Sequence, residues 1–284
     1  MKYSNVIEMD IWSNFGCFSK PFSNTGGILS FLIPPKTSII GIIGAILGYE
    51  FDKIMEDETY SIEELYDIKI SVQPLFDLKS KRVTFNRVEG TSNKLSISNI
   101  HQDVLINPYY KLFISFPDSL KDEEKLFINR IKNHETIFSL YMGRNEFPLS
   151  FKLCNIFDYE SKVLNSNNIN DFFSNDEKIF GLLNRNFIKE TELVSISNSS
   201  NEKELIFNFN KNEKILKSFY EYIIREYPIK RTKFTEFTYA DVSFYAAKNM
   251  KDCYFSKLVF KDDLSDDQYL ELTKIGEHQW ISLI

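Results

Sequence analysis

The chain of 284 residues has an apolar fraction of 43% and a formal net charge of −6. This length and apolar content suffice for one large or two ordinary domains, and the negative charge argues against a surface that binds nucleic acid indiscriminately. Glu8 and Asp10 interrupt the apolar core that a signal peptide would have, and no apolar run is long enough to cross a bilayer. We therefore expect a cytoplasmic protein with no membrane partner.

The residues that usually carry metal or nucleophile chemistry are sparse. Three cysteines, Cys17, Cys154 and Cys253, lie far apart and outside any CxxC spacing, so we expect buried thiols and neither a disulfide framework nor a zinc site. No HxxxH, HExxH or GxSxG motif occurs. The sequence predicts no metal ion, no cofactor and no serine nucleophile.

The first elements are predicted to be a strand and then a helix. Residues 3–12 have the pattern of a strand, residues 14–27 that of a loop rich in Gly, Ser and Asn, and residues 34–50 that of an apolar helix. The helix carries glycines at i, i+3 and i+7, namely Gly41, Gly44 and Gly48. Each glycine inside a helix costs roughly 0.5–1 kcal/mol, so we interpret the row as a stripe that lets the helix pack closely on a sheet.

The front of this helix has two possible roles. Lys36 and Thr37 follow two prolines and lie beside the unpaired amide groups of the first turn. Such a turn could bind a phosphate group, because its amides carry partial positive charge. It could equally be an ordinary capped helix start.

The next elements complete an alternating α and β order. Strands are predicted at 68–78 and 108–117, a helix at 119–141, and a strand at 147–160. A long excursion with strand-like pieces around residues 83–88 separates the first two of these strands. The resulting βαββαβ order predicts an α+β fold in which residues 1–160 form a ferredoxin-like, RRM-like domain.

The composition changes after residue 160. Asn- and Ser-rich segments at 163–176 and 195–202 are predicted to be surface loops. The remaining predictions are one short helix at 212–224 and strands at 187–197, 204–210, 234–245 and 253–260. We interpret residues 161–284 as a second, smaller and mostly β domain.

A local basic segment occurs within this acidic chain. Residues 78–115 contain six positive and two negative side chains, a net charge of +4, together with hydrogen-bonding residues such as Asn86. This composition fits a solvated basic loop as well as it fits a hairpin that contacts RNA phosphates. A second basic cluster, Lys230, Arg231 and Lys233, is more typical of a solvated surface.

One pair of residues leaves a catalytic alternative open. Lys132 and His134 could serve metal-independent RNA cleavage, in which an acid/base pair activates a 2′-hydroxyl group. A Lys-x-His pair on a helix surface is usually not catalytic.

Several segments resemble one protein family. The stretch FGCFSKPFSNTGGILSFLIPPKTSIIGIIGAILGYE, residues 15–50, resembles the N-terminal signature of the Cas-five family, the RAMP-type subunit of type I CRISPR Cascade complexes. YMGRNEFPLSF, residues 141–151, resembles a further family segment, and EFTYADVSFYAA and the terminal GEHQWISLI resemble the C-terminal half of its type I-B branch. Only the first of these matches is strong.

The resemblance implies a role in holding guide RNA. Members grip the repeat-derived 5′ handle of the CRISPR RNA, contact the large subunit and the adjacent backbone subunit, and meet target DNA only through the complex. A hairpin thumb projects from their ferredoxin-like domain, and the basic excursion lies where that thumb would fall. The I-B branch leaves RNA cleavage to a separate nuclease, so we assign no catalytic residue; a metal-independent endoribonuclease is the alternative.

The predicted RNA-binding residues come from the helix front, the loop before it and the basic excursion. They are Lys20, Lys36, Thr37, Lys79, Lys81, Arg82, Asn86 and Arg87. The aromatic motif with which RRM sheets stack on bases is absent, so base stacking on the sheet is not predicted.

Overall fold

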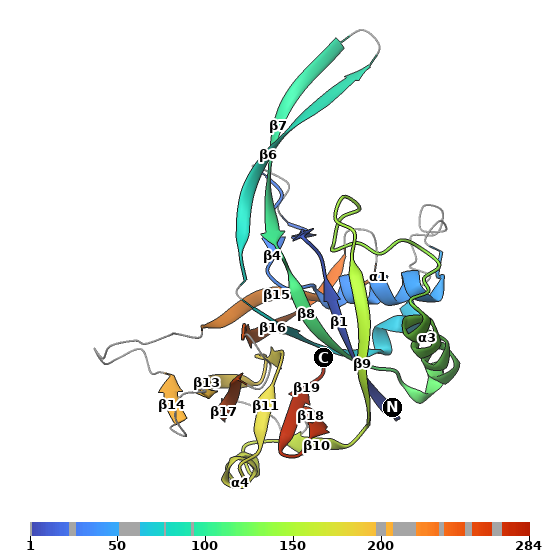
Figure 1. The fold of residues 1–284 in the computed structure, drawn as a ribbon. Coiled ribbons are helices and arrows are strands. Elements are labelled where there is room, and N and C mark those ends of the chain that lie inside the picture. Colours follow the sequence, from blue (N-terminus) through green and yellow to red (C-terminus); the bar gives the residue numbers. More distant parts are fainter. Residues whose placement is uncertain are drawn as a thin grey trace, which may run out of the picture.

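The protein combines α and β structure and consists mostly of strands. The computed structural model describes residues 2–22, 27–50, 63–76, 78–91, 94–196, 203–206, 220–232, 236–247, 252–262 and 269–284. A long hairpin rises from a body made of two larger sheets and their helices (Figure 1). None of the helices in these ranges has the length and hydropathy that crossing a membrane would require.

A four-stranded antiparallel sheet forms the first part of the body. Its order is β5 (Lys69–Pro74), β8 (Tyr109–Ser115), β1 (Asn5–Trp12) and β9 (Ser150–Asp158). Helix α1 (Lys36–Leu47) connects β1 to β5, and α3 (Lys121–Asn133) connects β8 to β9. Both helices pack on the sheet face to which alternate β1 residues, Ile7, Met9 and Ile11, contribute their buried side chains.

Two predicted helix boundaries were wrong at the C-terminal end. The second helix was expected to reach residue 141, but α3 ends at Asn133 and His134 takes a left-handed conformation with φ of 56°. The chain then leaves the helix direction, and the Phe138 amide donates to the carbonyl oxygen of Ala45 at 3.1 Å. The first helix ends at Leu47, so Gly48 lies outside it as a left-handed cap with φ of 79°.

The glycines of α1 do not form one close-packing stripe. Gly44 is buried, as that interpretation requires, but a methyl group added at Gly41 would meet no atom within 4 Å outside the helix backbone. Gly48 lies against the side chain of Ile137. A Cβ added at Gly48 would be 3.0 Å from the Cγ1 atom of that residue. The spacing places the three glycines on one face of a continuous helix, but the helix ends before Gly48, and Gly41 and Gly44 differ in burial.

We expect Gly41→Ala to stabilise the protein by about 0.5–1 kcal/mol, because alanine restricts the unfolded chain and fits the helix at an open position. Gly48→Ala is the matched comparison and should destabilise it, because alanine would be strained at a positive φ. Urea unfolding of both variants measures the difference. Equal effects of the two substitutions would contradict the assigned environments.

The second large sheet follows directly after β9. Its order is β10 (Ser161–Leu164), β18 (Leu270–Gly276), β19 (Gln279–Ser282), β11 (Lys178–Phe180), β17 (Cys253–Phe260), β13 (Ile188–Ile196) and β14 (Lys203–Ile206). The segment 163–176, predicted to be a loop, contains the end of β10 and the short helix α4 (Ile169–Ser174). The chain therefore passes from one sheet to the other at residues 159–160.

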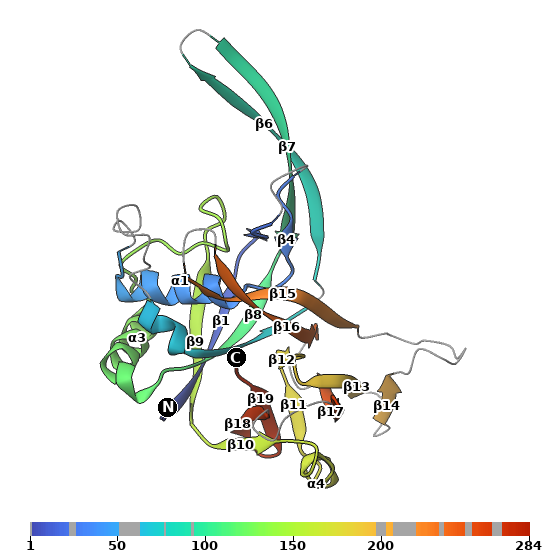
Figure 2. The ribbon, with the colours of Figure 1, turned by 180° about the vertical axis from the view of Figure 1, so that it is seen from behind.

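A small sheet from the second half of the chain packs on the first half. It consists of β12 (Leu183–Asn184), β16 (Phe237–Tyr245) and β15 (Glu221–Arg231), and β15 lies next to the front of α1 (Figure 2). Tyr227, Val242 and Phe244 share one hydrophobic core with α1 and the four-stranded sheet. The predicted helix 212–224 was wrong at residues 221–224, which belong to β15, and its remaining residues up to 219 lie outside the described ranges.

Candidate nucleic-acid interface

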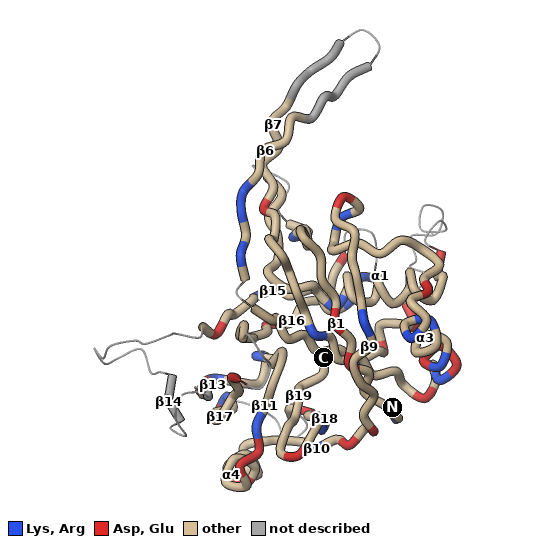
Figure 3. The backbone as a smooth tube through the Cα atoms, viewed as in Figure 1, with Lys and Arg blue, Asp and Glu red and all other residues tan. Residues whose placement is uncertain are grey.

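The basic excursion forms a long two-stranded hairpin. Strand β6 (Ser80–Thr91) pairs in antiparallel register with β7 (Lys94–Ile106), and the short strand β2 (Phe15–Gly16) joins β7 at its foot. The hairpin extends well beyond the body (Figure 1), and Lys and Arg residues follow the lower part of β6 (Figure 3). The short 3₁₀ helices η1 (Glu63–Asp67) and η2 (Asp118–Leu120) lie in the body and not in this hairpin.

Strand alternation divides the predicted hairpin residues between two faces. Lys81 lies on the face of Val83 and Phe85, while Arg82 and Asn86 lie on the opposite face. The two faces differ in chemistry, because the first is largely apolar and the second pairs polar residues across the strands. One extended RNA strand on one face would therefore not meet both groups.

The predicted hairpin residues also differ in whether a neighbouring side chain pairs with them. Lys79 and Lys81 are exposed, and so is Asn86. Arg82 is exposed too, but its Nε donates to Asp103 Oδ1 at 3.0 Å, which neutralises part of its charge. Arg87 belongs to β6 by its backbone, and its side chain lies outside the described part.

The loop before α1 docks on the hairpin. The Ile28 amide donates to the His101 carbonyl at 2.7 Å, and the Asp103 amide donates to the Ile28 carbonyl at 2.9 Å. Short strands β3 (Phe18–Ser19) and β4 (Ser30–Phe31) pair with each other and hold the base of this loop. Lys20 is half-buried there, with its Nζ 5.4 Å from the centre of the Phe31 ring.

Gly27→Ala should undock this loop, because Gly27 has φ of 140° and an added Cβ would lie 2.8 Å from the backbone oxygen of His101. We expect a loss of about 1–2 kcal/mol in the local stability of the docked loop. Hydrogen exchange at the Ile28 and Asp103 amides measures it. Unchanged protection of both amides would contradict the docked arrangement.

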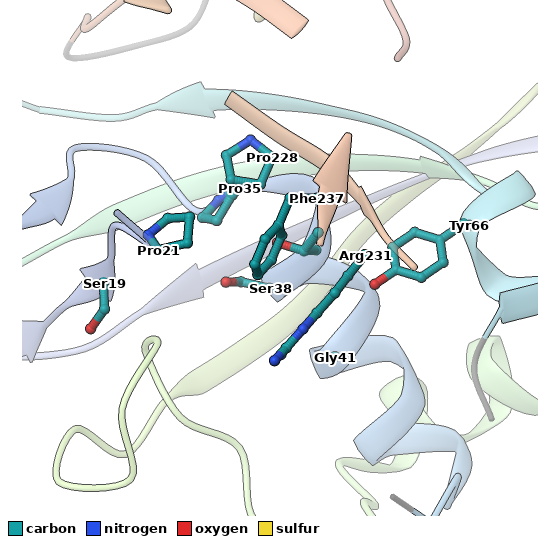
Figure 4. Close-up of a pocket in the computed structure, with 10 residues that line it drawn as sticks. Ser19, Pro21, Pro35, Ser38, Gly41, Tyr66, Pro228, Arg231 and Phe237 are labelled. Carbon is teal, nitrogen blue, oxygen red and sulfur yellow. The ribbon is translucent and has the colours of Figure 1, made fainter. Parts of the chain in front are cut away.

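A shallow cavity of about 330 Å³ lies at the front of α1. Its lining combines residues from the loop, the helix, η1, β15 and β16: Ser19, Pro21, Pro35, Thr37, Ser38, Gly41, Tyr66, Pro228, Arg231 and Phe237. In Figure 4 the Arg231 side chain extends beside α1 near Gly41 and Tyr66. The guanidinium also lies 5.1 Å from the centre of the Phe237 ring.

One of the three predicted residues around the helix front lines the cavity. That residue is Thr37; Lys20 is not among the lining residues, although its chain neighbour Ser19 is. Of the second basic cluster, Arg231 lines the same cavity and Lys230 pairs with Glu63 at 3.2 Å, while Lys233 lies outside the described ranges. Sequence spacing could not find the contribution of Arg231 and Phe237, because both come from strands far along the chain.

Lys36 points into the fold and not toward the cavity. Only 7% of it is exposed, and its Nζ donates to the carbonyl oxygen of Ile284 at 3.1 Å. Burial lowers the pKa of Lys36 to about 8; Asp67 opposes this shift, and the neighbouring cations Lys69 and Lys230 add to it. The expectation that Lys36 faces RNA rested on its position at the helix start, but β15 and residue 284 cover that side of the turn.

The residues considered for catalysis lie at the end of α3. Lys132 and His134 are both exposed, and they stand two positions apart, a spacing that does not bring side chains together on a helix. The His134 ring lies 5.6 Å from that of Phe151. No group of three or more His, Cys, Asp or Glu that could bind a metal ion occurs among the described residues. Cys17 and Cys253 are buried, whereas Cys154 is exposed, contrary to the expectation of buried thiols.

A protein-family model decides the family. The model described as "CRISPR-associated protein (Cas_Cas5)" matches residues 6–200, which include the loop, the helix front and the hairpin. The chain belongs to the CRISPR-associated Cas5 family. No curated protein matches this Cas5 chain.

Solved structures resemble the Cas5 chain only distantly. A chain of a "CRISPR RNA-guided surveillance complex" is 10% identical, with a TM-score of 0.42 over 87% of this chain and 95% of that one. A CRISPR protein from Archaeoglobus fulgidus is 11% identical, with a TM-score of 0.41 over 99% and 98% of the two chains. A third structure, a "CRISPR-associated Protein", is 12% identical, with a TM-score of 0.35 over 55% and 69%. The family assignment rests on the family model and not on these similarities.

Proposed function

We propose that this Cas5-family chain is the non-catalytic RNA-binding subunit of a type I Cascade complex, of the I-B branch, and holds the 5′ repeat-derived handle of the guide RNA. Its protein partners would be the backbone subunit and the large subunit, and it would meet target DNA through the complex. The order β5-β8-β1-β9 with α1 and α3 on one face supports a ferredoxin-like, RAMP-type domain.

The observation that carries this proposal is the hairpin β6–β7 with exposed lysines at its foot. Lys79 and Lys81 lie where the hairpin leaves the body, and the loop with Lys20 docks on the neighbouring strand β7. Cations on adjoining elements can contact successive phosphates of one strand, whereas sequence-independent binding over the whole surface is opposed by the net charge of −6. Thr37 and Arg231 at the front of α1 extend this surface beyond the loop.

The proposal is tested with purified full-length protein and a synthetic RNA of the CRISPR repeat from the same genome. We expect the protein to bind the half of the repeat that forms the 5′ handle more tightly than a scrambled RNA of equal length. Incubation without metal ions should leave the RNA intact. A single cut at the handle boundary, abolished by His134→Ala, would favour the endoribonuclease instead.

The assembly partners require a second measurement. Co-expression with the backbone and large subunits should yield a complex that contains this chain and RNA. A complex that forms equally well without this chain, and retains a protected 5′ handle, would contradict the proposed role.

A further inference from the structure

The sheet face opposite α1 and α3 carries a row of aromatic rings at its upper end. Alternation along β1 directs Trp12 to this face, and Trp12 is the register partner of Tyr109 at the start of β8. Phe76, two residues after the end of β5, packs beside Tyr109. We call Trp12, Tyr109 and Phe76 the aromatic row.

Phe76 is the exposed ring of the row, whereas Trp12 and Tyr109 are half-buried. The rings of Trp12 and Tyr109 are stacked, with centroids 5.7 Å apart and planes 13° apart, and the Phe76 ring meets Tyr109 edge-on at 5.8 Å. Phe76 is 50% exposed and has φ of 66°, a left-handed conformation that a bulky side chain rarely adopts. The Phe76 amide donates to the carbonyl oxygen of Ala247 at 3.0 Å, which holds the backbone in this conformation and leaves the ring exposed.

Cations lie at both ends of the row. Lys152 is exposed on β9 opposite Asp10, next to the register pair of Trp12 and Ser150, and Lys79 is exposed three residues after Phe76. The acidic side chains of this face are engaged in contacts of their own. Asp10 accepts hydrogen bonds from Tyr109 at 2.8 Å and from Lys111 at 2.9 Å, and Lys111 also pairs with Glu8.

We propose that the aromatic row binds single-stranded RNA by stacking on its bases, with Lys152 and Lys79 contacting the flanking phosphates. Stacking platforms bounded by cations are the usual means of binding a single strand without reading its sequence. This inference rests on the proposed RNA-binding function and extends it, because Lys79 joins the row to the foot of the hairpin. RNA held at the hairpin foot would thus continue onto the aromatic row, at the end of a sheet face that is covered farther along by the second sheet, where Val6 and Phe113 are fully buried.

Tryptophan fluorescence can report this contact directly. The chain has two tryptophans, and Trp280 is buried, with its indole N–H donating to Glu177 at 2.7 Å. The variant Trp280→Phe therefore leaves Trp12 as the single reporter. Titration with decauridylate that carries no fluorescent label, at low salt, should quench the fluorescence of Trp12 until the binding site is saturated. A decamer of abasic nucleotides, which offers phosphates without bases, should give little quenching.

Affinity measurements give a second, independent readout. Phe76→Gly removes the ring and relieves the left-handed backbone, so it should fold normally and bind labelled decauridylate about 5- to 100-fold more weakly by anisotropy. Tyr269→Ala, which removes an exposed aromatic ring beside β18, is the control and should bind like the wild type.

The outcomes separate this inference from the function on which it rests. If decauridylate and the handle RNA bind without quenching Trp12, and Phe76→Gly binds both normally, the aromatic row is not an RNA site while the hairpin proposal stands. If neither RNA binds the purified chain, both are rejected. Quenching by a purified Cascade subunit in the absence of RNA would assign the row to a protein contact instead.

Discussion

Replacing Lys79 and Lys81 together by alanine is expected to weaken binding of the 5′ handle RNA by about 10- to 100-fold at moderate salt, because each lysine would lose one phosphate contact. The salt dependence is the more specific readout. Each phosphate contact to a single strand contributes about 0.7 to the slope of log K against log salt, so the double variant should lose about 1.4 from that slope. Both quantities come from one anisotropy titration repeated at several salt concentrations.

The matched control removes the same charge elsewhere. Lys121 and Lys132 are exposed on α3, and their double replacement by alanine changes the net charge by the same amount as the hairpin variant. It should leave the slope unchanged if RNA contacts are confined to the hairpin foot. An equal loss of slope in both variants would show that the total charge of the protein governs binding, and would contradict a localised interface.

Arg82 offers a finer comparison within the hairpin. It lies on the face opposite Lys81 and is paired with Asp103. We therefore expect Arg82→Ala to reduce affinity less than Lys81→Ala. The sequence placed both in one basic segment, because composition records which charges are present but not which face of a two-stranded hairpin each one occupies.

The elements that sequence patterns predicted well are those whose residues alternate clearly. Residues 5–12 and 109–115 carry apolar side chains at every second position over most of their length, and both are strands of the four-stranded sheet. The apolar helix at 36–47 was equally clear from its pattern. Local periodicity fixed these elements because burial on one face determines both the pattern and the fold.

The candidate interface depended on contacts that the sequence does not encode locally. Arg231 reaches the cavity at α1 because β15 packs on that helix, although almost 200 residues separate them in the chain. The apolar spacing of segment 212–224 predicts a helix, but the Tyr222 ring stacks on the Phe244 ring of the neighbouring strand, with centroids 5.3 Å apart. Strand pairing with β16 overrides the helical tendency of residues 221–224.

The position of Lys36 is the clearest case in which local sequence does not reveal a contact between distant parts of the chain. A lysine at a helix start beside unpaired amides suggests an anion site, and only the packing of β15 and residue 284 on that turn reveals that its ammonium group is buried. The Tyr227 hydroxyl donates to the carbonyl oxygen of Pro34 at 2.8 Å and holds β15 against the same turn. We therefore expect Lys36 to affect the stability of the fold and not RNA binding. The pH dependence of the unfolding free energy can measure this effect.

We expect the stability of the wild type, relative to that of Lys36→Met, to rise with pH between about 8 and 10.5. The pKa of Lys36 is lowered to about 8 in the folded protein from 10.5 in the unfolded chain. Between these values the unfolded chain binds more protons than the folded protein, so raising the pH favours folding. The full difference corresponds to about 3 kcal/mol, and at pH 7 the relative stability should not depend on pH.

Urea unfolding of both proteins at pH 7, 8, 9 and 10 supplies the measurement, because subtracting the two curves cancels the titration of all other groups. Lys257→Met, which removes one exposed lysine of β17, is the control for the loss of a positive charge. Handle RNA affinity should be the same for Lys36→Met and wild type at pH 7, because the buried ammonium group does not reach the surface. A relative stability that falls with pH, together with weaker RNA binding by Lys36→Met, would instead place Lys36 beside an anion and restore the role that its position at the helix start suggests.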